Sequence, residues 1–178
     1  IFIKNPTLGT VKTRLAKSIG DEMALKVYKR LLEKSQKETK AVSAERHLFY
    51  SKEIKEDSWS TKHFKKHLQV DGNLGLKMRS AFETVIEPSS KTIIIGSDCY
   101  DLTSEIIEEA FELLDKNDLV IGPANDGGYY LLGMNKLVPE LFEDIEWSTE
   151  VVLSQTLNKA KELGLKVKCL QELIDIDN

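Results

Sequence analysis

The chain has few cysteines and no long apolar run, and these two deficits exclude several classes of protein. Its 178 residues include only Cys99 and Cys169, too few and too far apart for a metal knuckle or a disulfide-stapled scaffold. No apolar run approaches the ~20 residues that a membrane-spanning helix needs. The formal net charge of −4 argues against a general nucleic-acid binder. We therefore expect a cytoplasmic protein without a membrane span or a nucleic-acid partner.

What is present has the composition of an ordinary globular domain. Hydrophobic residues make up 41% and charged residues 30% of the sequence, and this length suits one domain. The chain begins at Ile1 without a methionine and stops at Asn178, directly after an acidic motif. We therefore expect residues 1–178 to be a single domain that lacks a few residues at each end.

Short apolar runs alternate with amphipathic helical patterns along most of the chain. The expected strands are residues 1–3, 47–50, 68–70, 93–95, 119–121, 129–132 and 165–170, and the expected helices are residues 11–19, 21–40, 74–85, 106–114 and 149–163. This alternation predicts the α/β class with a largely parallel sheet. The polar segment 52–67, with Trp59 among clustered charges, is expected to be a surface excursion.

The strand expected at residues 93–95 is followed by Gly96, Ser97 and Asp98. In open α/β sheets, ligands bind in the crevice outside the carboxyl ends of the strands. A carboxylate at that place can hold a hard cation that bridges the phosphates of a nucleotide. The alternative is that Asp98 only begins the turn into the next helix.

The first loop carries the cations Lys4 and Lys12, and Arg14 follows in the next helix. Between a strand and a helix, free backbone N–H groups and the helix dipole favour an anion. The loop contains Gly9 but lacks the order of a Walker A loop and of a dinucleotide fingerprint. Phosphate binding by these cations is one interpretation, and a solvated basic loop is the other.

A second candidate segment contains Asp126, Gly127 and Gly128, followed by Tyr129. The two glycines allow a close backbone approach to a ligand, and Asp126 could bind sugar hydroxyls or orient an acceptor. Asp-Gly between two strands is equally a hairpin signal. Trp147 could stack on a base or a sugar, although it could instead be a packing anchor. At the end of the chain, alternating acidic residues could face the cavity of Asp98 or form a solvated strand face.

The order of these segments resembles a bacterial glycosyltransferase-like family that includes radical-SAM/selenodomain-associated and arsenosugar-biosynthesis-type transferases. The resemblance is carried by residues 4–16, 96–103, 122–133, 147–149 and 175–177, and so spans nearly the whole chain. It implies the nucleotide-diphospho-sugar transferase (GT-A) fold, a three-layer α/β/α domain with a mostly parallel mixed sheet. The family is also similar to 2-phospholactate guanylyltransferases and molybdenum-cofactor nucleotidyltransferases. This chain departs from it at Tyr100, where the family usually has proline.

The resemblance also implies roles for individual residues. Asp98 would bind Mg²⁺ or Mn²⁺ together with Asp177 or, as the weaker alternative, Asp175. The implied nucleotide- and phosphate-binding residues are Lys4, Gly9, Lys12, Arg14 and Ser97. The implied sugar- and acceptor-binding residues are Asp126, Gly127, Gly128, Tyr129 and Trp147. Asp98, Asp126 and Arg14 would take part in catalysis.

The expected activity is therefore a metal-dependent transfer from an activated nucleotide to a small-molecule acceptor. We expect first a glycosyltransferase that uses a nucleoside diphosphate sugar. A nucleotidyltransferase that joins a nucleoside triphosphate to a small phosphorylated acceptor is the second hypothesis. A nucleotide-binding protein without catalysis is the third.

Overall fold

The computed structural model describes residues 1–176. The strands are β1 (Phe2–Ile3), β2 (His47–Tyr50), β3 (Lys65–Leu68), β4 (Thr92–Ile95), β5 (Leu119–Pro123), β6 (Tyr129–Met134) and β7 (Val167–Cys169). The helices are α1 (Thr13–Ile19), α2 (Asp21–Ala41), α3 (Leu74–Val85), α4 (Ser104–Leu113) and α5 (Val152–Glu162), with a short 3₁₀ helix, η1 (Pro139–Phe142). No helix in this part of the chain is long and apolar enough to cross a bilayer.

The strands form two hydrogen-bonded sheets, where the sequence predicted one. The first has the order β1-β2-β3 and is parallel throughout; the second has the order β4-β6-β5-β7. In the second, β6 is antiparallel to both of its neighbours, whereas β5 and β7 are parallel. Because a tight turn joins β5 directly to β6, this pair has to be antiparallel. The α/β class with mixed strand directions is confirmed.

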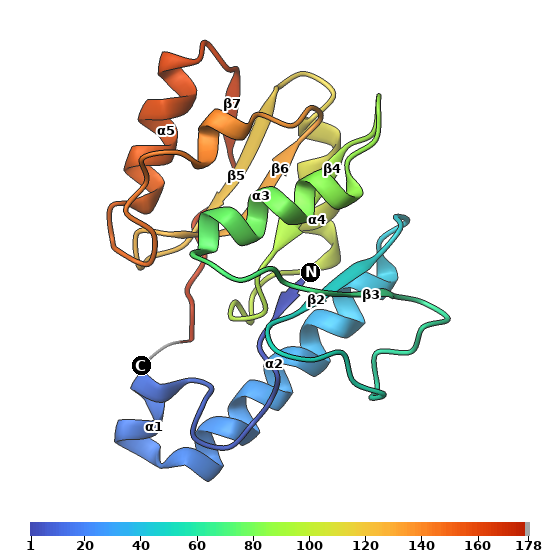
Figure 1. Ribbon diagram of the computed structural model, residues 1–178, viewed down its shortest axis with the longest axis vertical. Helices are drawn as coiled ribbons and strands as arrows, with labels where there is room; N and C mark the ends of the chain where they lie inside the picture. Colours follow the sequence, from blue (N-terminus) through green and yellow to red (C-terminus); the bar gives the residue numbers. More distant parts are fainter. Residues whose placement is uncertain (177–178) are drawn as a thin grey trace.

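The helices cover the sheets on both sides and make three layers (Figure 1). On one side, Ile106 and Ile107 of α4 pack with Ile95 of β4, while α2 packs on β1 and β2. On the other side, Met78 and Phe82 of α3 contact residues of both sheets in one apolar cluster that also includes α5 and η1. The expected α/β/α layering is confirmed.

Helix α3 illustrates how the sequence specifies its elements. Met78, Ala81 and Phe82 recur at helical spacing and are buried on one face. Asn73 caps the helix, because its side chain accepts a hydrogen bond of 2.9 Å from the backbone N–H of Leu76. Such a cap contributes about 1 kcal/mol, and burying a side chain like Phe82 contributes about 1.5–3 kcal/mol.

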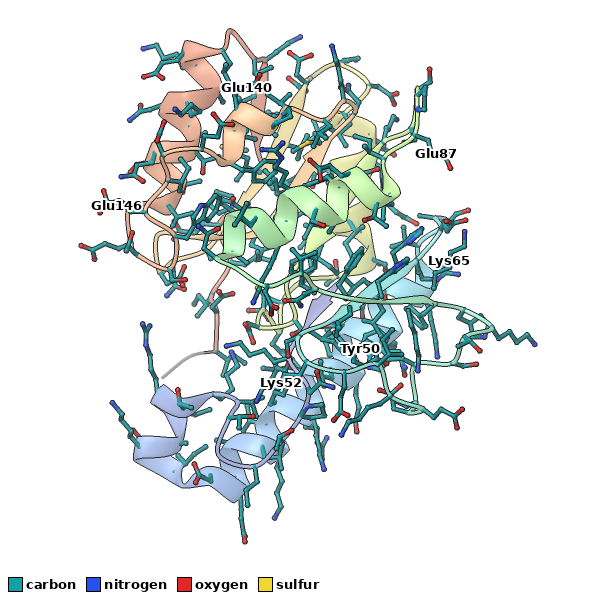
Figure 2. The ribbon with its side chains drawn as sticks, in the orientation of Figure 1. Tyr50, Lys52, Lys65, Glu87, Glu140 and Glu146 are labelled. Carbon is teal, nitrogen blue, oxygen red and sulfur yellow. The ribbon has the colours of Figure 1, made fainter. Side chains whose placement is uncertain are left out.

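The surface excursion expected at residues 52–67 is confirmed for most of its residues, which are exposed, but the prediction is wrong in two respects. Strand β3 begins at Lys65, three residues before the expected strand. Its residues are exposed or half-buried, so no buried face marks it in the sequence. Trp59 is 3% exposed and packs edge-on against Phe64 with ring centroids 4.8 Å apart. Figure 2 shows the neighbouring Tyr50 inside the fold, while charged side chains such as Lys65 project outward.

The last described residues return to the end of β4. Ala124 pairs with Leu173, and Cys99 pairs with Asp175, through isolated bridges. The backbone N–H of Ile176 donates to the Asp98 carbonyl at 3.1 Å. This return places Asp175 beside the end of the central strand, as the acidic ending implied. Asp177, the first choice as second metal ligand, lies outside the described residues.

Candidate functional site

A cleft opens at the carboxyl ends of β1, β2, β3 and β4 and consists of two adjoining chambers. The outer chamber, of about 740 Å³, is lined by Lys4, Lys12, Thr13, Arg14, Tyr28, Asp98, Asp126, Ser148, Thr149 and Glu150. The inner chamber, of about 520 Å³, continues between α3 and the sheets. The two share Lys4, Tyr28, Asp98, Asp126 and Ser148. This is the edge of the sheets where α/β proteins bind ligands.

The outer chamber is strongly charged. Lys4, Lys12 and Arg14 face it from the first loop and α1, and they meet carboxylates that include Asp98 and Asp126. The structure thus brings together the cations and acids from three separate segments of the sequence. Helix α1 has only seven residues, so the side-chain cations, rather than the end of this helix, are the groups here that suit an anion.

Lys12 and Asp98 form the central ion pair of the outer chamber. Lys12 Nζ lies 2.7 Å from Asp98 Oδ1, and the Lys12 side chain is 3% exposed while that of Asp98 is 40% exposed. Lys12 adopts left-handed backbone angles, with φ at 49°, at the start of α1. Such a conformation costs a residue with a side chain about 1–2 kcal/mol. The chain tolerates this strain at the residue whose ammonium reaches Asp98.

Tyr28 ties the first loop to the end of β4. Its hydroxyl accepts a hydrogen bond of 2.8 Å from the Lys4 N–H, donates to the Lys4 carbonyl at 3.1 Å, and lies 3.2 Å from Ser97 Oγ. Burial raises the pKa of Tyr28 to about 12, so the hydroxyl stays neutral and keeps its proton. Ser97 is buried and lines the inner chamber. Sequence reasoning missed Tyr28 because its helical spacing indicated a core residue.

The hairpin between β5 and β6 places Asp126 in both chambers. Asp126 Oδ1 accepts a hydrogen bond of 2.9 Å from the Gly128 N–H, which fixes the carboxylate. Gly127 has a φ of +84°, and a Cβ there would overlap the backbone of Glu150. Gly127 therefore lets the segment before α5 pack against the hairpin, which positions Ser148 at the cleft. Both interpretations of this segment, a turn and a cleft wall, are compatible with this arrangement.

Three other predicted residues lie less centrally. Tyr129 lines the inner chamber, but its hydroxyl is buried beside Thr156, and burial raises the pKa of that hydroxyl. Trp147 lines neither chamber, since its indole packs against Gly75 of α3 and near Phe142. Gly9 is exposed with a φ of +73° and also lines neither chamber. Trp147 therefore lies where a packing anchor would, which was the alternative interpretation of this residue.

The inner chamber contains polar residues that sequence reasoning did not select. Gln69 lies directly after β3, and Lys77 lies in the first turns of α3. Gln69 was missed because it fell inside the strand expected at residues 68–70. Its position directly after the carboxyl end of the true strand is the signal that could have identified it. The buried thiol of Cys99 also lines this chamber, but burial raises its pKa to about 12, so it is no thiolate nucleophile.

The donor set fits the implied Mg²⁺ or Mn²⁺ in one of two possible ways. Within residues 1–176, no group of three or more His, Cys, Asp or Glu side chains could hold a metal ion. An all-protein cage is therefore not built from these residues. Mg²⁺ at nucleotide sites usually takes one or two carboxylates together with substrate phosphates. Asp98, which is partly exposed in both chambers, fits that second mode.

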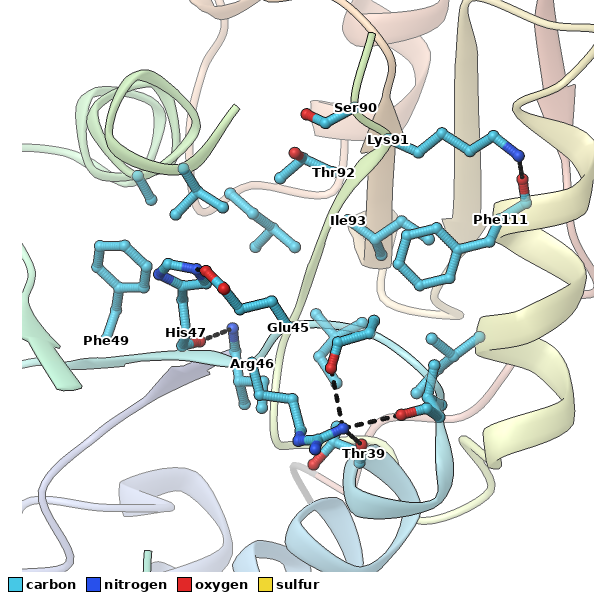
Figure 3. A pocket seen from close by; sticks show the side chains of 18 of the residues that line it. Thr39, Glu45, Arg46, His47, Phe49, Ser90, Lys91, Thr92, Ile93 and Phe111 are labelled. Atoms are coloured by element: carbon cyan, nitrogen blue, oxygen red, sulfur yellow. Dashed lines mark hydrogen bonds and ion pairs between the residues drawn. The ribbon is translucent and has the colours of Figure 1, made fainter. Parts of the chain in front are cut away.

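A separate cavity of about 280 Å³ lies between the two sheets (Figure 3). Arg46 and Lys91 at its rim donate to backbone carbonyls, at 2.8 Å to Val42 and 2.9 Å to Phe111. Its walls include Ile93 and Phe49, and none of the predicted site residues within the described part of the chain lines it. The candidate site is therefore the two-chambered cleft.

Comparison with known proteins gives a family and a fold. The family model "Uncharacterized protein conserved in bacteria (DUF2064)" matches residues 34–149. The search of curated proteins found no match. Among solved structures, a proposed nucleotide-diphospho-sugar transferase from Desulfovibrio desulfuricans G20 is similar with a TM-score of 0.90 at 28% identity, covering 99% of this chain and 80% of that one.

Two more distant structures share the fold. The 4-diphosphocytidyl-2C-methyl-D-erythritol synthase from Anaerococcus prevotii DSM 20548 has a TM-score of 0.57 at 13% identity, with 83% of this chain and 80% of that one covered. The bifunctional IspDF from Campylobacter jejuni has a TM-score of 0.56 at 10% identity, with 79% and 41% covered. The predicted nucleotide-diphospho-sugar transferase fold is confirmed. The closer kinship with radical-SAM-associated transferases stays a prediction.

Proposed function

This chain belongs to the DUF2064 family, and we propose that it is a transferase that moves a sugar from a nucleoside diphosphate sugar to a small acceptor. The observation that carries the proposal is the outer chamber, where Lys4, Lys12 and Arg14 meet Asp98 and Asp126 at the carboxyl ends of the strands. The likeness to the proposed nucleotide-diphospho-sugar transferase, which spans 99% of this chain, supports the same substrate class.

In this proposal the cations of the outer chamber bind the diphosphate. Arg14 is exposed at the mouth and offers a planar fork that suits phosphate oxygens. Lys12 is buried at the base, where its ammonium can interact with Asp98 and a phosphate together. As the bond between the sugar carbon and the diphosphate breaks, the leaving group keeps the electron pair, and these fixed cations stabilise its charge.

Asp126 is the proposed base. Its carboxylate is exposed in the chamber and is oriented by the Gly128 N–H. The acceptor hydroxyl forms the new bond to the sugar carbon, and its proton passes to Asp126. Tyr28 is unsuited to that task, because its hydroxyl is already engaged with the Lys4 backbone and Ser97.

We propose that Mg²⁺ or Mn²⁺ binds with the diphosphate and that Asp98 is its protein ligand in the described part of the chain. When bound, such an ion neutralises charge on the diphosphate. Asp98 suits this role because its side chain is partly exposed at the junction of the two chambers. Asp177 is the second proposed ligand.

The proposal is tested by measuring thermal stability and binding heat with nucleoside diphosphates, their sugar conjugates and triphosphates, with and without Mn²⁺. Metal-dependent stabilisation by one diphosphate and its sugar conjugate is expected, because a ligand at a hundred times its Kd stabilises by about 2.7 kcal/mol. Arg14→Gln should weaken that binding, whereas Arg30→Gln, a matched change on an exposed face of α2, should not. No response to any nucleotide would refute the proposal.

A nucleotidyltransferase is the second candidate, because the fold is shared with the 4-diphosphocytidyl-2C-methyl-D-erythritol synthase. That chemistry uses a triphosphate and releases pyrophosphate. A preference for a triphosphate over every diphosphate sugar, together with pyrophosphate release, would favour this second candidate. Binding of a nucleotide with no turnover of any donor would favour a protein without catalysis.

A further inference from the structure

Two polar side chains of the inner chamber have no part in the mechanism above. Gln69 follows β3, and Lys77 projects from α3, so both come from elements that bound the chamber away from Arg14. Neither lines the outer chamber. Their surroundings differ from the outer chamber too, since the inner walls include the apolar side chains of Ile3, Met78 and Ile94.

The Gln69 amide is held in one orientation. Its Nε2 donates to the carbonyl of Ile3 at 3.2 Å and to the carbonyl of Phe49 at 3.0 Å. Both N–H bonds of the amide are thus committed to backbone oxygens. A flipped amide would place Oε1 against the same two carbonyl oxygens, which repel it. Gln69 therefore presents a fixed hydrogen-bond acceptor, Oε1.

Lys77 supplies the complementary group. Its side chain is half-buried on the α3 side of the chamber, and no carboxylate among residues 1–176 pairs with its ammonium. An ammonium donates hydrogen bonds and accepts none. The end of the chamber that Gln69 and Lys77 line thus combines apolar walls with a fixed acceptor and a cationic donor. Ligand sites of this kind suit a flat apolar group with a polar edge.

We propose that the inner chamber binds the nucleobase of the donor, and that Gln69 and Lys77 are the residues that select its edge. This inference rests on the proposed function, because it assumes that the outer chamber holds the diphosphate. A base has apolar faces for the walls, N–H groups for Gln69 Oε1 and carbonyl or ring-nitrogen acceptors for Lys77. A sugar or a phosphorylated acceptor would leave the walls of Ile3, Met78 and Ile94 against polar groups, at a cost.

The two chambers adjoin, so that one nucleotide can extend through both. They meet at residues that both share, among them Asp98 and Lys4. The volume of about 520 Å³ lies within the range of small-molecule pockets. A nucleotide whose phosphates contact Lys12 and Arg14 can therefore extend its base past Asp98 toward Gln69.

The test compares nucleoside diphosphates with inorganic pyrophosphate, which lacks a base. Dissociation constants for UDP, GDP, CDP, ADP and pyrophosphate are measured by calorimetry in Mg²⁺ for the unaltered chain and for Lys77→Met. The variant keeps the aliphatic stem but loses the donor. We expect the best nucleoside diphosphate to bind about tenfold more weakly, and pyrophosphate to bind unchanged. The control Lys161→Met, on an exposed face of α5 away from both chambers, should change neither.

Gln69→Leu provides the second variant and should weaken the same diphosphate about tenfold, with its melting temperature recorded to show that it folds. Arg14→Gln should weaken the diphosphate and pyrophosphate alike, because it acts on the phosphates. Unchanged diphosphate affinity in Lys77→Met and in folded Gln69→Leu would overturn this inference and leave the proposed function intact. Failure of the unaltered chain to bind any of these ligands would overturn the proposed function itself.

Discussion

Replacing Gly127 by alanine should destabilise the protein much more than the same change at another glycine with positive φ. Gly127 has a φ of +84°, and an added Cβ would overlap the Glu150 backbone. Gly164 has a φ of +68°, but an added Cβ there would have no neighbour within 4 Å. The pair therefore separates the cost of a left-handed backbone from the cost of a steric overlap.

The expected magnitudes follow from these two surroundings. A left-handed conformation costs a residue with a Cβ about 1–2 kcal/mol, which is all that Gly164→Ala should lose. Gly127→Ala should lose additional stability through the steric overlap, because overpacking of a well-packed region costs about 1–3 kcal/mol. For a chain of this length, each kcal/mol lowers the melting temperature by about 2–4 °C. Gly127→Ala should therefore melt several degrees below Gly164→Ala.

Denaturant unfolding of the two variants and the unaltered chain measures the difference directly. The overlap is with backbone, and the Leu153 N–H donates to the Gly127 carbonyl at 2.8 Å, so the neighbour cannot move away alone. Ser148 and Glu150, which line the outer chamber, should shift with it, and diphosphate binding should weaken in Gly127→Ala only. Equal losses of stability in the two variants would refute the tight packing of the hairpin against this segment.

Three further changes test other parts of the molecule. Asp98→Asn should abolish metal-dependent nucleotide binding in calorimetry, and unchanged metal dependence would contradict the assignment. Its cost in stability should lie between the ~1 kcal/mol of an exposed pair and the ~3–5 kcal/mol of a buried one, since Asp98 is 40% exposed but Lys12 is 3% exposed. Trp59→Ala should cost about 3–5 kcal/mol in denaturant unfolding, because the indole is buried against Phe64, whereas a surface tryptophan would cost under about 0.5 kcal/mol. Burial and the nearby His47 lower the pKa of His67, so the unfolded chain takes up this proton first and stability should fall as the pH drops through about 6.5. His67→Gln should make the melting temperature depend less on pH in this range. An equally steep dependence in the variant would show that another group causes it.

The elements that the sequence predicted well are those with a buried face. The run of isoleucines in β4 and the helical spacing of Met78, Ala81 and Phe82 in α3 report burial directly. Strand β3 gives no such signal, because its residues at the edge of the sheet are exposed or half-buried. The error of three residues there also hid Gln69, which follows the true strand. The antiparallel direction of β6 was readable from the Asp126 hairpin, but the alternation of strands and helices was given more weight.

Trp59 shows a different limit. Charged and polar neighbours such as Asp57, Ser58 and Ser60 surround it in the sequence, and they predict solvent exposure. Its burial depends on Phe64 and on residues of α2 that pack from a distance along the chain. One of the charges is itself engaged, since Asp57 accepts hydrogen bonds from the Tyr50 hydroxyl at 2.9 and 3.0 Å. The partners in α2 lie far from Trp59 along the chain, so the sequence around Trp59 does not report its burial.

In the candidate site, sequence order identified the residue types and the structure adds how they pair. Asp98, Lys12, Arg14 and Asp126 were all selected, and all line the outer chamber. The sequence does not show that the Lys12 ammonium reaches Asp98, or that Lys12 has a left-handed backbone at the start of α1. Trp147 was assigned to a ligand from its residue type, although its neighbours in space are Gly75 and Phe142.

The charge balance of the outer chamber affects how a diphosphate can bind there. Among residues 1–176, the outer chamber opposes three cations, Lys4, Lys12 and Arg14, to three carboxylates, Asp98, Asp126 and Glu150, so the formal charges of these residues cancel. A diphosphate adds negative charge to this balanced set, and Asp98 repels it unless a cation intervenes. Lys12 already pairs with Asp98 at 2.7 Å, so only part of its positive charge acts on the phosphates. In the proposed function, a divalent ion bound with the diphosphate would offset the charge of Asp98, and the measured affinity should accordingly depend on the ion more steeply than on added salt.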